Sequence, residues 1–167
     1  MSIASDPATF RHVLGHYPTG VCVVTAMQSH GEPVGMAVGS FTSVSLDPPL
    51  VGFFPDRRSR TWPTIASVGR FCVNVLAEHQ EPLCRIFATS GSDKFKHTSY
   101  RLSEQGMPIL GGIVAWIDCE LYQTYDAGDH LFVLGKVHAL EVDQPNSPLL
   151  FFKGGYGQFS SLQPMSS

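Results

Sequence analysis

Apolar and β-branched residues gather in short runs along much of this chain, and turn-forming residues separate the runs. Runs of this length and composition between turns are typical of β-strands. The turns are plain at residues 29–33, at Asp47-Pro48-Pro49 and at Asp126-Ala127-Gly128-Asp129, where a tight hairpin would join the two longest runs. The predicted strands are residues 21–26, 34–45, 50–54, 71–76, 113–125, 131–142 and 149–152.

Three segments have features of short helices instead. The first begins after Asp6, which can cap it, and Pro7 fits the first helical position. Its apolar residues recur on one side at Phe10, Val13, Leu14 and Tyr17. The other two are predicted over residues 61–67 and 78–88, and residues 89–112 are mostly polar and irregular.

Strands therefore dominate, without the regular β-α-β alternation of a doubly wound sheet. The pattern predicts a mainly β protein, an antiparallel barrel covered by a few short helices. The chain has 167 residues and shows no internal repeat or linker, so residues 1–167 are predicted to form one domain with a core at about residues 10–159.

Composition excludes several classes of protein. Hydrophobic residues make up 43% of the chain and charged residues 15%, a balance that disfavours intrinsic disorder. Eleven Lys and Arg against fourteen Asp and Glu give a net charge of −3, which does not favour a phosphate-neutralising nucleic-acid binder. No apolar run reaches the ~18–20 residues of a membrane span. The first residues lack the basic region and apolar core of a signal peptide, so we expect no export.

The four cysteines point to a reducing compartment. Cys22, Cys72, Cys84 and Cys119 are widely spaced, with no CxxC pair and no Cys/His cluster at metal-ligand spacing. Three of them lie in apolar, strand-like runs, where a reduced cysteine behaves as a small hydrophobic residue. We therefore expect buried thiols, no metal site and a cytoplasmic location.

The chain has no GxGxxG, P-loop, GxSxG or HExxH motif, so its chemistry must come from other patterns. The densest is Gly39–Ser45, where hydroxyl side chains stand among small residues beside exposed backbone. Such a surface suits a flat heterocycle with polar edges. In a regular strand, Ser43 and Ser45 would face one side with Phe41, and Ser40 and Thr42 the other. The alternative is a hydroxyl-bearing strand beside a subunit contact.

A second pattern is the charged loop Arg57-Arg58-Ser59-Arg60-Thr61 at the predicted start of a helix. Ser59 or Thr61 could cap this helix, and Pro63 favours the later start because proline is tolerated in the first turn. Unpaired helix amides, hydroxyls and guanidinium groups together would make a phosphate site. The alternative is an ordinary cap on a solvated loop.

A third pattern is Gly128-Asp129-His130, which would present a histidine ring where the hairpin turn enters the longest apolar strand. It could equally be a polar residue at a strand end. Lys94 and Phe95 add a cation and an aromatic ring in a loop, which by themselves indicate little.

Together these segments resemble the short-chain flavin reductases, the reductase components of two-component, flavin-dependent monooxygenases. The order and spacing of the segments carry the resemblance, which covers nearly the whole chain. The matching segments are residues 34–50, 59–61, 69–76, 93–95, 118–120, 128–130 and 148–152.

The resemblance implies an FMN-binding split β-barrel that forms a homodimer, with FAD as a less common flavin and NADH or NADPH as hydride donor. The implied flavin-contacting residues are Gly39, Ser40, Phe41, Thr42 and Ser45 at the ring, Ser59, Arg60 and Thr61 near the phosphate, and Asn74, Arg85, Lys94 and Phe95 elsewhere in the pocket. The implied nicotinamide-contacting residues are Gly128, Asp129 and His130, with Tyr156 closing over the nucleotide. Relatives more often carry a larger polar residue such as Asn at position 39, so Gly39 removes one side-chain contact.

The expected reaction is hydride transfer from the nicotinamide to the flavin, with no catalytic side chain, because the cofactors carry the chemistry and the protein aligns them. Reduced flavin would leave for a separate monooxygenase component, and neither nucleic acid nor membrane is expected as a partner. The alternative is an FMN-binding electron carrier that no nicotinamide reduces directly, for which Gly128-Asp129-His130 would have no use.

Overall fold

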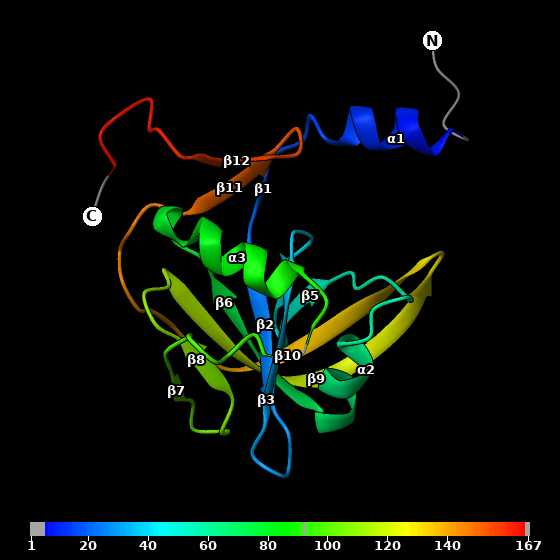
Figure 1. Ribbon diagram of the computed structural model, residues 1–167, viewed down its shortest axis with the longest axis vertical. Coiled ribbons are helices and arrows are strands. Elements are labelled where there is room, and N and C mark those ends of the chain that lie inside the picture. Colours follow the sequence, from blue (N-terminus) through cyan, green and yellow to red (C-terminus); the bar gives the residue numbers. More distant parts are fainter. Residues whose placement is uncertain (1–5, 92, 166–167) are drawn as a thin grey trace.

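A computed structural model describes residues 6–91 and 93–165 of the chain (Figure 1). Antiparallel strands make up most of it, and short helices lie at their side. Within the described residues, no helix is long and apolar enough to cross a lipid bilayer. The helices are α1 (Pro7–Leu14), α2 (Trp62–Val68) and α3 (Glu81–Ala88), the last preceded by the 3-10 turn η1 (Glu78–Gln80).

A seven-stranded antiparallel sheet forms the body of the protein, with the strand order β3-β2-β6-β9-β10-β5-β4. The edge strands β3 and β4 are consecutive in the chain, so the segment between them crosses from one edge of the sheet to the other. The strands of this sheet are β2 (Cys22–Met27), β3 (Pro33–Val38), β4 (Thr42–Leu46), β5 (Pro49–Phe53), β6 (Arg70–Val75), β9 (Ala115–Ala127) and β10 (His130–Val142).

Two smaller sheets complete the fold, in the order β1-β11-β12 and β7-β8. In Figure 1 the first of these lies above the large sheet, and α1 extends outward beside it. The backbone N–H of Lys153 donates to the carbonyl of Gly15, 2.9 Å away, and ties the end of α1 to this small sheet. The strands are β1 (Thr19–Gly20), β7 (Tyr100–Leu102), β8 (Pro108–Leu110), β11 (Leu149–Phe152) and β12 (Gly155–Gln158).

The mainly β class predicted from the sequence is confirmed, and the finer expectation of a split barrel stays a prediction. One predicted strand is wrong in its extent. Residues 34–45 form two strands, β3 and β4, because Gly39–Phe41 carries the chain between opposite edges of the sheet. The simple alternation of side chains expected there also fails, since the pairing with β5 shifts register between Ser43 and Ser45. Strands β1, β7, β8 and β12 were not predicted.

The interior is apolar and includes the cysteines. Phe53 packs edge-to-face on Trp62 and Phe71, with ring centroids 5.4 and 5.5 Å apart. All four cysteines are buried and free, as predicted. Burial raises the pKa of the Cys22 and Cys119 thiols to about 12, so both remain neutral and contribute as apolar side chains.

Helix α1 is capped as predicted, but its apolar residues do not enter the core. The Asp6 carboxylate accepts hydrogen bonds from the backbone N–H groups of Ala8 and Thr9. None of the helix's residues is buried, and Val13 is 56% exposed. The apolar spacing of this segment therefore predicted the helix correctly without indicating a partner for its apolar side.

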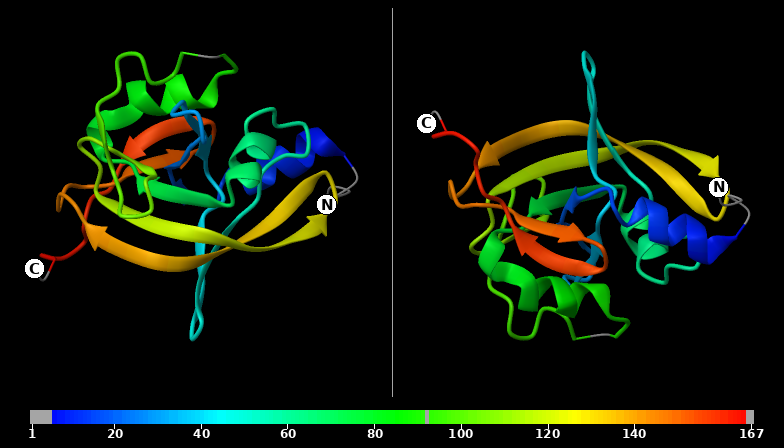
Figure 2. Two further views of the ribbon diagram at one scale, coloured as in Figure 1. Left: turned by 90° about the horizontal axis from the view of Figure 1, so that it is seen from below. Right: turned by 90° about the horizontal axis from the view of Figure 1, so that it is seen from above.

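The β4–β5 hairpin projects far from the rest of the molecule (Figure 2, cyan). Its tip carries Leu46, which is 98% exposed, and Val44 on the same strand is 44% exposed. Apolar residues on a long projecting hairpin are unusual for a surface that faces only water.

Candidate flavin and nucleotide site

A groove runs along the free edge of β3. It consists of two cavities of about 350 and 460 Å³ that share Met36, Ala37 and Ser59 in their walls. The first cavity is also lined by Gly39, Ser40, Phe54, Asp56 and His130. The second is also lined by Arg58, Arg60, Thr61, Phe87 and Lys94.

The backbone of β3 supplies hydrogen-bonding groups to this groove. The carbonyl of Gly35 accepts a hydrogen bond from Lys94 Nζ, 3.2 Å away, so it points away from the neighbouring strand β2. Because successive residues of an antiparallel strand turn their N–H and C=O groups to opposite sides, Ala37 has the same outward orientation. The groove therefore has a donor and an acceptor on the backbone of Ala37, suited to the polar edge of a planar ligand.

Ser40 lies in the segment that crosses from β3 to β4, and it binds the backbone just after β5. Its hydroxyl oxygen accepts a hydrogen bond from the backbone N–H of Phe54 at 2.9 Å. The hydroxyl proton remains free to donate to another group. Gly39 precedes it in the same wall, where the lack of a side chain leaves the backbone open.

The start of α2 differs from the predicted phosphate site in one respect. The Ser59 hydroxyl caps the helix by accepting from the N–H of Trp62 at 3.1 Å, and Pro63 has no N–H. The next two amides, of Thr64 and Ile65, both donate to the carbonyl of Thr61. The helix amides are thus already engaged, and the expectation that they hold a phosphate is wrong. Side chains beside this helix start offer other donors.

Those side chains come from two segments far apart in the sequence. Ser59, Arg60 and Thr61 follow β5, while Lys94 lies in the loop after α3, and all four line the second cavity. Lys94 is half-buried and donates to the carbonyls of Gly35 and Phe87 at 3.2 and 3.3 Å. Burial lowers the pKa of this ammonium group, because there is little water to solvate its charge. A bound anion would restore that stabilisation.

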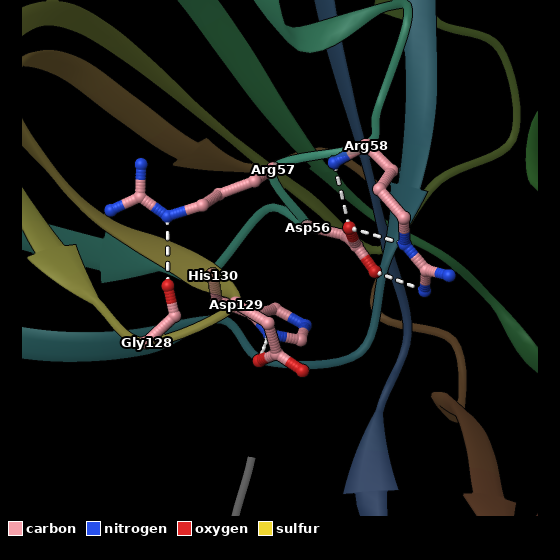
Figure 3. Close-up of polar contacts among 6 residues, drawn as sticks. All are labelled: Asp56, Arg57, Arg58, Gly128, Asp129 and His130. Carbon is pink, nitrogen blue, oxygen red and sulfur yellow. Dashed lines mark hydrogen bonds and ion pairs between the residues drawn. The ribbon is translucent and has the colours of Figure 1, made fainter.

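His130 begins β10 at the other end of the groove, next to the Gly128-Asp129 turn (Figure 3). Its Nδ1 atom lies 2.7 Å from Asp129 Oδ1, and its ring lines the first cavity. Asp56 faces it across an isolated β-bridge. Two hydrogen bonds from the Arg58 guanidinium, at 3.1 and 2.9 Å, hold the pKa of Asp56 well below its usual range, so this carboxylate is ionised.

Several predicted ligand residues do not line this groove. Phe41 packs on the core, whereas Thr42 and Ser45 lie on β4 of the projecting hairpin. Phe95 lines a smaller cavity of about 150 Å³ beyond Lys94, where its ring packs edge-to-face on Phe87.

Asn74 is fully buried and its amide is saturated by the protein. Its Nδ2 donates to the carbonyl of Val23 and to Thr25 Oγ1, both at 3.1 Å. Its Oδ1 accepts from the backbone N–H of Leu110 at 2.8 Å. The prediction that Asn74 contacts the flavin is therefore wrong on geometry, because the residue joins β2, β6 and β8 inside the core.

Tyr156 and Arg85 form a separate cluster. The Tyr156 hydroxyl lies 3.4 Å from Cys84 Sγ, and the Arg85 guanidinium stacks over the ring at 5.0 Å. Tyr156 lines an apolar cavity of about 160 Å³, and Gly39 borders both this cavity and the groove. The structure therefore places these two residues near the groove but outside it.

Several residues of the groove wall were not predicted from the sequence, among them Met36, Ala37 and Asp56. Met36 and Ala37 lie within the run of residues 34–50 that carries the family resemblance, and Asp56 directly precedes the charged loop predicted as a phosphate site. Their proximity in the sequence to predicted ligand residues was the one available sign of their role. Motif matching alone does not use such proximity.

Comparison with known proteins assigns this chain to a family. Residues 14–160 match the model of the "Flavin reductase like domain". A flavin reductase of Pseudomonas putida is 57% identical over 95% of this chain and 94% of its own length. The reductase subunit HsaB of a flavin-dependent monooxygenase from Rhodococcus jostii is 44% identical over 96% of this chain and 80% of its own. The structure of the Streptomyces globisporus NADH:FAD oxidoreductase SgcE6, in complex with NAD and FAD fragments, superposes with a TM-score of 0.91 at 34% identity and covers 98% of this chain and 99% of that one.

The chain belongs to the flavin reductase family. It is an oxidoreductase of the class that reduces flavin with a nicotinamide nucleotide and supplies reduced flavin to monooxygenases. The resemblance inferred from the sequence is confirmed.

Proposed function

We propose that the flavin lies in the groove along β3, with its ring at Ala37, Gly39 and Ser40 and its phosphate among Ser59, Arg60, Thr61 and Lys94. The observation that carries this placement is the half-buried Lys94 ammonium at the wall of the second cavity. FMN fits these groups, and FAD is the alternative flavin because the groove continues past Lys94 into a third cavity lined by Thr64 and Phe95.

The residues present suit such a ligand. The ring end of the groove offers the backbone of Ala37 and the hydroxyl of Ser40, which are neutral donors and acceptors. The phosphate end offers cations, since Arg58, Arg60 and Lys94 all line it. A planar ring with polar edges and an anionic tail therefore meets matching chemistry at each end.

The protein binds and aligns the two reactants in this mechanism. When bound, a flavin would supply the chemistry that takes up the hydride of a nicotinamide nucleotide, so no side chain would need to act as acid or base. His130 contacts the nucleotide at the open side of the groove, and the walls formed by Met36 and Phe54 keep water from the ring faces. NADH or NADPH serves as donor. The resemblance also favours release of the reduced flavin to a separate monooxygenase component, and the buried, reduced cysteines fit the cytoplasm.

The direct test is oxidation of NADH and NADPH by the purified protein with FMN or FAD, followed at the nicotinamide absorbance band. Oxidation above the protein-free rate that depends on both flavin and protein supports the proposal. Tight FMN binding without nucleotide oxidation would instead identify an electron carrier.

Replacing His130 with alanine should raise the KM for NADH by about five- to tenfold, the effect of one lost hydrogen bond and ring contact. The dissociation constant for FMN should stay within about twofold, because the phosphate-binding side chains are untouched. Steady-state kinetics and a fluorescence titration with FMN measure the two quantities. His138→Ala, eight residues along the same strand, is the matched control. Equal losses of NADH and FMN affinity would contradict the assignment of His130.

We also propose that the protein is a homodimer in which a second copy covers the β4–β5 hairpin. The exposed Leu46 and Val44 support this proposal, since burial of their apolar area is favourable in water. Leu46→Asp should shift the protein toward monomer in size-exclusion chromatography with light scattering. Leu162→Asp, equally exposed but in the C-terminal segment, should not. A wild-type monomer across a wide range of concentrations would contradict the proposal.

A further inference from the structure

Arg57 lies outside the groove wall, on the loop that leads from β5 to the phosphate-binding side chains. It faces the turn between β9 and β10, which consists of Gly128 and Asp129. The last residues paired in this hairpin are Ala127 and His130, so the carbonyls of Gly128 and Asp129 have no partner within the hairpin ladder.

Arg57 binds both of these carbonyls. Its backbone N–H donates to the Asp129 oxygen at 3.0 Å. Its Nε donates to the Gly128 oxygen at 2.8 Å, the contact drawn from Arg57 in Figure 3. The same guanidinium also donates through Nη2 to Asp126 Oδ1 at 2.5 Å. One residue thus makes three contacts to a four-residue stretch that ends immediately before His130.

The turn needs such an anchor. Gly128 has φ +67°. Glycine adopts positive and negative φ about equally well, so this residue by itself does not keep the turn in one conformation. The same loop is also bound to the start of β10 just beyond the turn, where the Leu131 N–H donates to the Pro55 carbonyl at 2.9 Å. The His130 side chain is 42% exposed, so packing alone does not fix its ring.

We propose that Arg57 is a positioning residue for the nicotinamide nucleotide. It fixes the turn in one conformation, so that His130 faces the groove before the nucleotide arrives. Without the guanidinium, the turn samples more conformations and nucleotide binding must order it, which lowers affinity for the nucleotide and leaves the flavin unaffected. The inference rests on the proposed role of His130.

The test compares Arg57→Ala, Arg57→Lys and Asp126→Asn with the wild-type protein. For Arg57→Ala we expect the KM for NADH to rise about fivefold, which corresponds to about 1 kcal/mol of binding free energy that must then order the turn. The kcat and the FMN dissociation constant should change by less than about twofold, because the bound geometry and the phosphate site remain. Arg57→Lys keeps the charge near Asp126 but loses the fixed Nε donor, and Asp126→Asn removes only the ion pair, so both effects should be smaller.

Two measurements do not depend on turnover. Calorimetric titration of the FMN-loaded protein with NAD⁺ should show the same loss of affinity in Arg57→Ala. Hydrogen exchange should become faster at the amides of Gly128–Leu131 and remain unchanged elsewhere. The matched control is Arg101→Ala. Arg101 is another exposed arginine, it lies on β7, and its guanidinium pairs with the Asp143 carboxylate at 2.6 Å. This control should change none of the five quantities: the KM for NADH, kcat, the FMN dissociation constant, the NAD⁺ affinity and the exchange rates at Gly128–Leu131.

Unchanged NADH and NAD⁺ affinity in Arg57→Ala would overturn the inference, provided that His130→Ala lowers both. If His130→Ala has no effect on either affinity, the proposed role of His130 is wrong, and the role of Arg57 that rests on it is wrong as well. The His130→Ala result therefore distinguishes failure of the His130 role from failure of the Arg57 role alone. A parallel loss of FMN affinity and kcat in Arg57→Ala would also overturn it, because it would show a general disturbance of the loop.

Discussion

Replacing Lys94 with methionine should weaken FMN binding by about 10- to 100-fold, the range for loss of a charge-assisted hydrogen bond to a phosphate. The ammonium is half-buried, lines the second cavity and is held in place by the carbonyls of Gly35 and Phe87. It is therefore oriented before the ligand binds. Fluorescence titration gives the dissociation constant.

Riboflavin provides the matched ligand control, because it has the same ring and no phosphate. Its affinity for Lys94→Met should stay within about threefold of wild type, apart from a small effect on the loop. Lys96→Met is the control variant, since Lys96 is exposed and lies 3.8 Å from Asp93. Equal losses for riboflavin and FMN would show that Lys94 supports the fold of the groove and does not bind the phosphate.

The same group should make FMN binding depend on pH. Burial lowers the pKa of Lys94, so this ammonium loses its proton at a lower pH than an exposed lysine. FMN affinity should therefore fall as pH rises through that lowered pKa, while the phosphate, with a pKa near 6, stays fully charged. Riboflavin affinity, and FMN affinity in Lys94→Met, should not follow this fall.

Replacing Asn74 with alanine should lower the free energy of unfolding by about 3 kcal/mol, because it leaves the Leu110 N–H and other buried groups unpaired. The melting temperature should fall by about 6–12 °C for a chain of this size. The amide joins strands β2, β6 and β8, so the loss affects the centre of the sheet. Thermal denaturation followed by circular dichroism measures it.

This variant also tests the corrected role of Asn74. Below its transition, Asn74→Ala should bind FMN as the wild type does, because the side chain lies outside the groove. Asn146→Ala, which removes an exposed amide paired only with Gln144, should alter neither stability nor binding. A loss of FMN affinity in fully folded Asn74→Ala would restore the residue to the flavin site.

Elements with strong local signals were predicted well. The β9–β10 hairpin follows from long alternating runs and a Gly-containing turn, and α1 follows from the Asp6 cap and Pro7. The short strands β1 and β12 were missed because each forms through pairing with β11, which lies far from β1 in the sequence and immediately before β12. Strands of two to four residues carry no periodic pattern of their own.

The site was predictable to a similar extent. The loop at Ser59 and the turn at His130 were recognised as separate patterns, and both line the groove. Asn74 shows the limit, because membership of a matching segment does not distinguish a ligand contact from a buried structural amide. The amides at the start of α2 show a second limit of sequence reasoning, because they already donate to the Ser59 hydroxyl and the Thr61 carbonyl.

The order of residues by itself determined the β-rich class, the family and the segments that carry hydroxyls, cations and the turn histidine, because these depend on local alternation, capping and motif spacing. Only the tertiary structure decided that β3 lies at a sheet edge with its backbone exposed. It also decided that Lys94 lines the same cavity as Ser59 and Thr61, and that Arg57 forms hydrogen bonds to the turn before His130. Those contacts join residues tens of positions apart, and the pairing of strands across the sheet sets their distances.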